Sequence, residues 1–123
     1  MIKLLEHTRR PDISFYRNGT IRIASRVARI LSLRPGDAIN IAVNDGEYLL
    51  YAVRYQNTNC RYEAQCYRSK RGGGENYCAN SVRLCRALFN SVGVKSERVS
   101  YMTGEAYEKN GVVYVPIITL HPL

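Results

Sequence analysis

Three dipeptides that end in glycine, Asn18-Gly19, Asp45-Gly46 and Asn110-Gly111, constrain the fold of this chain more than any other feature. Asn-Gly and Asp-Gly favour tight turns between antiparallel strands because both residue types tolerate a positive φ. Each dipeptide adjoins a run in which apolar and polar residues alternate, which is the pattern of a half-buried strand. The sequence therefore predicts a mostly β fold with short helices.

The clearest unit runs from Phe15 to Arg54, with the predicted order strand, helix, strand, strand. Residues 20–24 alternate as a strand, and Ser25 follows as the predicted N-cap of a short helix. The predicted buried face of this helix consists of Val27, Ile30 and Leu31. The other face of the helix holds Arg26 and Arg29. We therefore expect that both arginines can be replaced by alanine without unfolding the domain.

Pro35-Gly36 ends this helix and predicts a type II turn, in which proline fixes the first central φ and glycine supplies the positive second one. Residues 39–44 and 48–53 then alternate on either side of Asp45-Gly46, which predicts a hairpin. Residues 55–74 form a polar and basic connector that ends in a glycine-rich loop.

The remainder of the chain, residues 75–118, has the pattern of a second unit. A helix is predicted over residues 81–90, and strands over residues 99–102 and 112–118; within the connector, residues 61–67 predict a further strand. Residues 26–31 match residues 83–88 at an offset of 57, and the Asp45-Gly46 turn matches Asn110-Gly111 at an offset of 65. These matches leave an internal duplication open.

The charge balance indicates a polyanionic partner. The 123 residues are enough for a single domain over residues 1–123, with 18 basic against 10 acidic residues and a net charge of +8. Fourteen of the basic residues are arginine, whose planar fork suits phosphate groups. Residues 9–34 contain seven arginines and the single acidic residue Asp12.

The first unit resembles the AbrB/MazE-type swapped-hairpin DNA-binding family over about a third of the chain. The family's strand pattern is met by residues 19–24, its helix by residues 25–30, and its turn, L-G-[IL]-x-x-G-D, by residues 31–37. The family's closing hairpin is met by residues 39–50. Ser32 stands where the family usually has glycine.

This resemblance implies a small swapped-hairpin barrel assembled from two strand-helix-strand-strand units. Two chains normally supply the units, as a homodimer, and the internal match adds the alternative that one chain supplies both, as in MraZ-type regulators. The implied function is a transcriptional regulator that contacts double-stranded DNA through arginines. The candidate DNA-binding residues are Arg17, Arg22, Arg26, Arg29, Arg34, Arg83 and Arg86.

Another class of function stays open beside DNA binding, namely an antitoxin-like or structural interaction module with an acidic protein partner. An enzyme is not expected, because the sequence contains no paired carboxylates, no nucleophile motif and no phosphate-binding glycine loop. No cofactor is expected. The sequence specifies neither a target DNA sequence nor a regulated gene.

Cysteine spacing and hydropathy argue against a metal site and against a membrane anchor. The four cysteines, at positions 60, 66, 78 and 85, form no C-x-x-C pair, so free thiols are expected rather than a metal site. No apolar run approaches the roughly 20 residues that span a bilayer, and no secretory signal is recognised at the N-terminus. A cytoplasmic protein is the expectation.

Overall fold

The computed structural model describes residues 10–55, 63–70 and 75–123. These residues form strands in two antiparallel sheets, together with two short helices, which confirms the mostly β class. The elements in chain order are β1 (Ile13–Tyr16), β2 (Thr20–Ile23), α1 (Ser25–Ile30), β3 (Ala38–Asn44), β4 (Glu47–Val53), β5 (Cys66–Arg68), β6 (Tyr77–Asn80), α2 (Val82–Val92), β7 (Arg98–Tyr101), β8 (Tyr107–Lys109) and β9 (Val112–Ile117).

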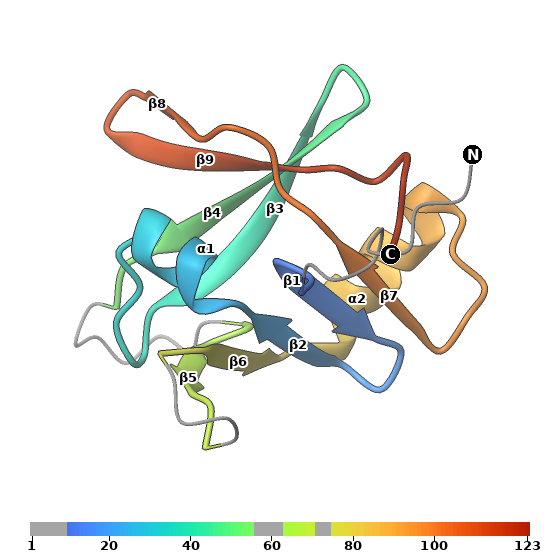
Figure 1. Cartoon of the computed structure of the whole chain (residues 1–123), viewed down its shortest axis with the longest axis horizontal. Coiled ribbons are helices and arrows are strands. Elements are labelled where there is room, and N and C mark those ends of the chain that lie inside the picture. Colours follow the sequence, from blue (N-terminus) through green and yellow to red (C-terminus); the bar gives the residue numbers. More distant parts are fainter. Residues whose placement is uncertain (1–9, 56–62, 71–74) are drawn as a thin grey trace.

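Each sheet combines strands from both halves of the chain. One sheet has the order β5-β6-β2-β1-β7 and is called the basic sheet below; the second sheet has the order β3-β4-β9-β8. Figure 1 shows the second sheet above the basic sheet, with α1 on the left and α2 on the right. Three long-range antiparallel pairs join the halves: β1 with β7, β2 with β6, and β4 with β9.

The expected barrel is not closed, so that part of the prediction is wrong. The basic sheet meets the second sheet at two seams, and each seam holds one isolated bridge: Ala38 with Gln65, and Thr103 with Ile117. Beside the first bridge, Ala64 has φ 52° and Gly36 has φ 95°, so the two segments share three backbone hydrogen bonds, at Gly36, Cys66 and Ile39, without a regular strand ladder. The sheets therefore remain two.

Two of the glycine dipeptides form the hairpin turns that the sequence predicts, and the third, Asn18-Gly19, joins β2 to β1, a strand that the sequence does not predict. Asp45-Gly46 joins β3 to β4 and Asn110-Gly111 joins β8 to β9, in both cases with two consecutive positive φ angles, as a type I′ hairpin requires. Gly19, with φ 102°, lies between β1 and β2. A Cβ at Gly19 would approach the Val82 side chain to 2.9 Å, so glycine also lets α2 begin against this turn.

The predicted N-cap of the first helix is wrong by one residue. Ala24 occupies the cap position, and its side chain makes no capping hydrogen bond. The Ser25 amide instead donates to Oδ1 of Asn76, at 2.9 Å, so a residue 51 positions away satisfies this helix end. The second helix begins as local rules predict, because Ser81 Oγ accepts the Leu84 amide.

Both helices end in the same way. The Leu33 amide donates to the Ala28 carbonyl, and the Val94 amide donates to the Phe89 carbonyl, each at 2.9 Å. Gly93 supplies the left-handed residue after α2, with φ 87°, whereas the first helix ends on Ser32, with φ 52°.

Ser32→Gly is expected to raise the free energy of unfolding by roughly 0.5 kcal/mol. Removing the Cβ relieves the left-handed strain, which outweighs the greater freedom of glycine in the unfolded chain. Ser32→Ala keeps that strain and should not stabilise the protein. Chemical denaturation of both variants checks this, and an equal gain from alanine would contradict it.

A continuous hydrophobic core fills the space between the two sheets and the helices. It includes Phe15 of β1, Leu50 of β4, Phe89 of α2 and Val115 of β9, all at most 1% exposed. On β2 the isoleucines point inward and Arg22 points outward, as the alternation predicts. This orientation places arginine on the outer face of the basic sheet.

The second half of the chain shares part of the order of elements of the first, with β7 as an additional strand between its helix and its closing hairpin. Residues 75–118 contain β6, α2, β7, β8 and β9, so a strand, a helix and a closing hairpin recur. In the connector, β5 (Cys66–Arg68) overlaps the strand predicted over residues 61–67 only at residues 66–67; residues 63–65 form a turn and an isolated bridge, and residues 61–62 lie outside the described residues. Most of the predicted glycine-rich loop, residues 71–74, also lies outside them.

Candidate nucleic-acid interface

The basic sheet has an unusually one-sided charge. Its five strands contain three arginines, Arg22, Arg68 and Arg98, and no aspartate or glutamate. The strands of the second sheet contain Glu47, Glu108 and Lys109 instead. A surface with uncompensated positive charge attracts polyanions.

Two of these arginines stack on one aromatic ring at the outer face. The guanidinium carbon of Arg22 lies 5.3 Å from the Tyr16 ring centroid, and that of Arg98 lies 5.9 Å from it. Both arginines are exposed, and neither makes an ion pair with a described residue. Contact with the ring restrains the guanidinium groups and leaves their N–H edges free to donate.

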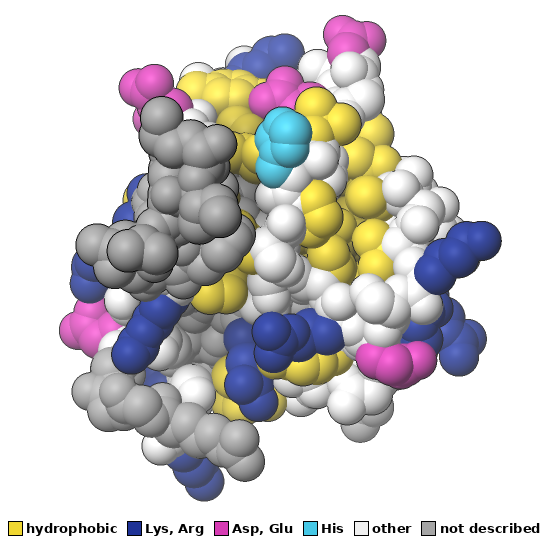
Figure 2. All heavy atoms as spheres, turned by 45° about the vertical axis from the view of Figure 1, so that its right-hand side comes forward, with side chains coloured by type: hydrophobic (Ala, Val, Ile, Leu, Met, Phe, Trp, Pro, Cys, Tyr) yellow, Lys and Arg dark blue, Asp and Glu magenta, His cyan; other side chains and the backbone are white. Residues whose placement is uncertain are grey.

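Polar side chains surround this arginine pair. Arg22 lies opposite Cys78 in the β2–β6 pair, and the neighbouring Asn80 amide donates to the Tyr67 hydroxyl at 3.1 Å. Figure 2 shows a face of the molecule on which Lys and Arg side chains gather in the lower part, while acidic side chains are fewer and stand apart.

Two of the seven predicted DNA-binding arginines bind within the protein instead. Arg17 donates to the backbone carbonyls of Val94 and Ser96 and lies over the Phe89 ring at 4.8 Å. Arg26 donates to the buried carboxylate of Asp12, at 3.0 Å, and to the Thr103 hydroxyl. Both arginines therefore stabilise contacts between distant parts of the chain.

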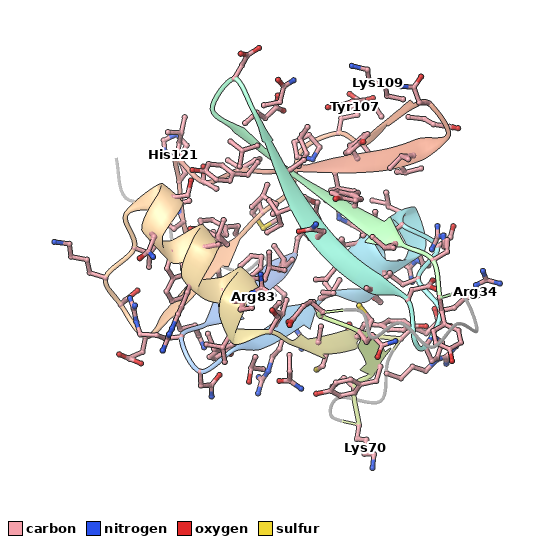
Figure 3. All side chains as sticks on the ribbon, turned by 180° about the vertical axis from the view of Figure 1, so that it is seen from behind. Arg34, Lys70, Arg83, Tyr107, Lys109 and His121 are labelled. Atoms are coloured by element: carbon pink, nitrogen blue, oxygen red, sulfur yellow. The ribbon has the colours of Figure 1, made fainter. Side chains whose placement is uncertain are left out.

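The other five predicted arginines are exposed, but they do not form one patch. Arg22 lies on the basic sheet, Arg29 and Arg34 lie on α1 and the following loop, and the last two lie on α2: Arg83 and Arg86. Figure 3 shows Arg34 at one edge of the molecule and Arg83 near the middle of a face. Arg83 is 3.9 Å from Glu63, and both side chains are mostly exposed.

Arg98 and Arg68 are not among the arginines that the sequence predicts to bind DNA. The signal for Arg98 was available, since it precedes the inward-facing Val99 and must point outward if β7 alternates. No local signal places Arg98 beside Tyr16, because that contact depends on the pairing of β1 with β7.

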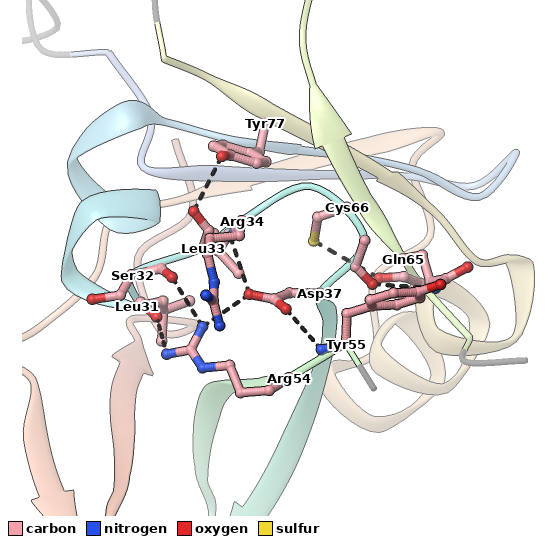
Figure 4. A network of polar contacts seen from close by, with 12 residues as sticks. Leu31, Ser32, Leu33, Arg34, Asp37, Arg54, Tyr55, Gln65, Cys66 and Tyr77 are labelled. Atoms are coloured by element: carbon pink, nitrogen blue, oxygen red, sulfur yellow. Dashed lines mark hydrogen bonds and ion pairs between the residues drawn. The ribbon is translucent and has the colours of Figure 1, made fainter. Parts of the chain in front are cut away.

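Two buried aspartates, Asp12 and Asp37, accept hydrogen bonds that hold segments next to the two sheets in place. Asp37 accepts hydrogen bonds from the amides of Tyr55 and Arg34 and from the Arg54 guanidinium, at 2.8, 3.0 and 3.0 Å (Figure 4). Burial raises the pKa of Asp37, but these three hydrogen bonds outweigh it, so the pKa lies below its ordinary value. For Asp12, burial likewise raises the pKa, and the bonds from Arg26 and Thr103 lower it further than burial raises it.

These depressed pKa values predict a loss of stability in acid. An aspartate whose folded-state pKa is lowered stabilises the fold above its unfolded-state pKa, and this contribution disappears as the pH falls below about 4. The free energy of unfolding should therefore fall steeply below that pH. Denaturation at several pH values checks this, and equal stability at pH values near 3 and 6 would contradict it.

The described cysteines are free thiols. Burial, with smaller effects from Asp37 and Cys78, raises the pKa of Cys66 to about 12, and burial also raises the pKa of Cys85. These two therefore remain protonated near neutral pH. Cys60 lies outside the described residues. Within the described ranges, no three His, Cys, Asp or Glu side chains are grouped to hold a metal ion.

Comparison with protein-family models, with curated proteins and with solved structures finds no match to this chain. Neither helix in the described part of the chain has the length and apolar character needed to cross a membrane.

Proposed function

We propose that this protein is a non-enzymatic DNA-binding protein, of the transcriptional-regulator type, that contacts the phosphates of duplex DNA through the outer face of the basic sheet. The observation that carries this proposal is the pair of exposed arginines stacked on Tyr16, on a sheet whose strands contain no acidic residue. DNA phosphates are the polyanion that such a surface suits best.

The stacked geometry favours phosphate binding over simple charge attraction. A guanidinium held near an aromatic ring by a cation–π contact keeps N–H groups that can donate to a phosphate. Part of the side-chain entropy is lost before binding, so less is lost when a phosphate arrives. Arg22 and Arg98 come from β2 and β7, so the pair forms only when the two halves of the chain assemble.

We further propose that the protein is related to the AbrB/MazE-type family and that its single chain forms an intrachain pseudo-dimer. Each sheet contains strands of both halves: β2 pairs with β6, where Arg22 lies opposite Cys78, and β4 pairs with β9, where Leu50 lies opposite Val115. The matching helix ends, at Ser32 and Gly93, agree with this proposal. A duplicated unit buries its apolar face without a second chain.

Replacing both stacked arginines by alanine should weaken binding to a random-sequence duplex about 100-fold at low salt, since two charge-assisted phosphate contacts are lost. The measurement is fluorescence anisotropy with a labelled duplex. The double lysine variant, Arg22→Lys with Arg98→Lys, keeps the charge and loses the stack, and should weaken binding only about fivefold.

A matched control removes two exposed charges elsewhere, Lys95→Ala with Lys109→Ala, and should change the affinity less than threefold because neither residue lies on the basic sheet. If both double alanine variants lose the same DNA affinity, the loss reflects net charge alone and not the contact surface around Arg22 and Arg98. If the unmodified protein binds no duplex but binds acidic proteins through Arg22 and Arg98, an interaction module replaces the DNA-binding proposal.

A further inference from the structure

A pocket of about 550 Å³ lies at the edge of the basic sheet, beneath the end of α1. Four arginines line it, from α1, the α1–β3 loop, the end of β4 and β5, together with one carboxylate, Glu75. We call it the arginine pocket and define it by Arg29, Arg34, Arg54 and Arg68. Its volume falls in the range of small-molecule binding sites.

One of the four arginines is a fixed part of the wall. Arg54 donates to the carbonyls of Leu31 and Ser32 and to Asp37 Oδ2, at 2.6, 3.0 and 3.0 Å. Tyr77, which also lines the pocket, donates its hydroxyl to the Leu33 carbonyl. Figure 4 shows these bonds holding the loop after α1 against β4 and β6. The wall is therefore organised before any ligand binds.

The charge of the pocket is not balanced. Asp37 compensates Arg54, and Glu75 compensates at most one of the remaining arginines. Arg29, Arg34 and Arg68 are exposed, and their guanidinium groups make no hydrogen bond or ion pair with any residue the structure describes. Converging guanidinium groups in a concave site favour a ligand with more than one negative charge.

Between the charged groups, the lining is apolar. Ala28, Leu33 and Tyr77 are among the lining residues, and because each is at most 7% exposed they offer narrow apolar edges at the base of the pocket. An inorganic anion would leave this surface and most of the volume unused. A ligand that has a flat organic body attached to two or more phosphates would use both.

We propose that the arginine pocket binds a small organic polyphosphate of the nucleoside diphosphate class, with the phosphates on Arg29, Arg34 and Arg68 and the organic body against Leu33 and Tyr77. This site is separate from the stacked arginines Arg22 and Arg98. It does not depend on DNA binding.

Isothermal titration calorimetry of the whole chain at about 0.1 M salt tests the proposal. The probes are ADP, pyrophosphate and adenosine. We expect ADP to bind about tenfold more tightly than pyrophosphate, which lacks the organic body, and at least tenfold more tightly than adenosine, which lacks the charge. No binding of ADP at millimolar concentration, or equal affinity for ADP and pyrophosphate, would overturn the proposal.

Variants locate the site. Arg34→Ala and Arg68→Ala should each weaken ADP binding about tenfold, because each removes a charge-assisted contact and neither guanidinium group supports the fold. Glu75→Gln should tighten it about threefold by removing a repulsive carboxylate, an effect that a purely structural role of Glu75 does not predict.

Two controls separate this site from the DNA interface. Arg22→Ala with Arg98→Ala should leave the ADP affinity unchanged, as should Lys95→Ala with Lys109→Ala. If Arg34→Ala and Arg68→Ala weaken duplex binding while ADP affinity stays constant, the pocket serves nucleic acid and the small-molecule assignment is wrong.

Discussion

Replacing Asp37 by asparagine should lower the free energy of unfolding by about 3 kcal/mol, which corresponds to a fall in melting temperature of about 10 °C. The Asp37 side chain is 2% exposed and accepts three hydrogen bonds through its two oxygens. An amide offers one acceptor oxygen and an NH₂ group, so in either orientation a donor faces a donor. Arg54 also loses its counter-charge.

Asp45→Asn is a matched control for this substitution. Asp45 is exposed in the β3–β4 turn, and Asn110 occupies the corresponding position of the β8–β9 turn with nearly the same φ. Its melting temperature should stay within about 2 °C of the unmodified protein. Thermal unfolding followed by circular dichroism measures both variants, and equal melting temperatures would refute the importance of the Asp37 network.

Arg26→Ala should destabilise the protein by about 2 kcal/mol, because it leaves the buried Asp12 carboxylate without its counter-charge. This expected destabilisation is smaller than that for breaking a fully buried ion pair, because the Arg26 side chain is 42% exposed and solvent screens its charge. The bonds from Thr103 to Asp12 remain, at 2.8 and 2.9 Å, but a neutral hydroxyl and an amide do not replace the charge.

Arg29→Ala, on the same helix, is the control for this variant and should change stability by less than about 0.5 kcal/mol. The expectation that both arginines of the exposed helix face are dispensable for folding is therefore restricted to Arg29. Urea denaturation compares the two, and similar midpoints would contradict the role assigned to Arg26.

Local patterns in the sequence predict the elements well because the forces that form them are local. The three glycine turns, the Pro35-Gly36 turn and the inward isoleucines of β2 depend on backbone preferences and alternation within a few residues. The same holds for the α2 cap at Ser81.

The features that the sequence does not predict depend on contacts between residues far apart in the chain. The cap of α1 comes from Asn76, and the partners of Arg26 are Asp12 and Thr103. A basic residue on an exposed helix face therefore looks the same in sequence whether it binds a ligand or a buried carboxylate. Of the predicted DNA-binding arginines, Arg17 and Arg26 bind groups within the protein, and Arg98, which the sequence does not single out, lies over the Tyr16 ring beside Arg22.

The salt dependence of DNA binding tests the proposed function most directly. Each phosphate contact adds about 0.9 to the slope of log affinity against log salt concentration, so removing Arg22 and Arg98 should make the slope shallower by about two units. We predict that the unmodified protein binds random duplex DNA at low salt with a linear decline, and that the double alanine variant shows this shallower slope. No binding at low salt, or identical slopes for the two proteins, would contradict the assignment of the basic sheet as a DNA-binding surface.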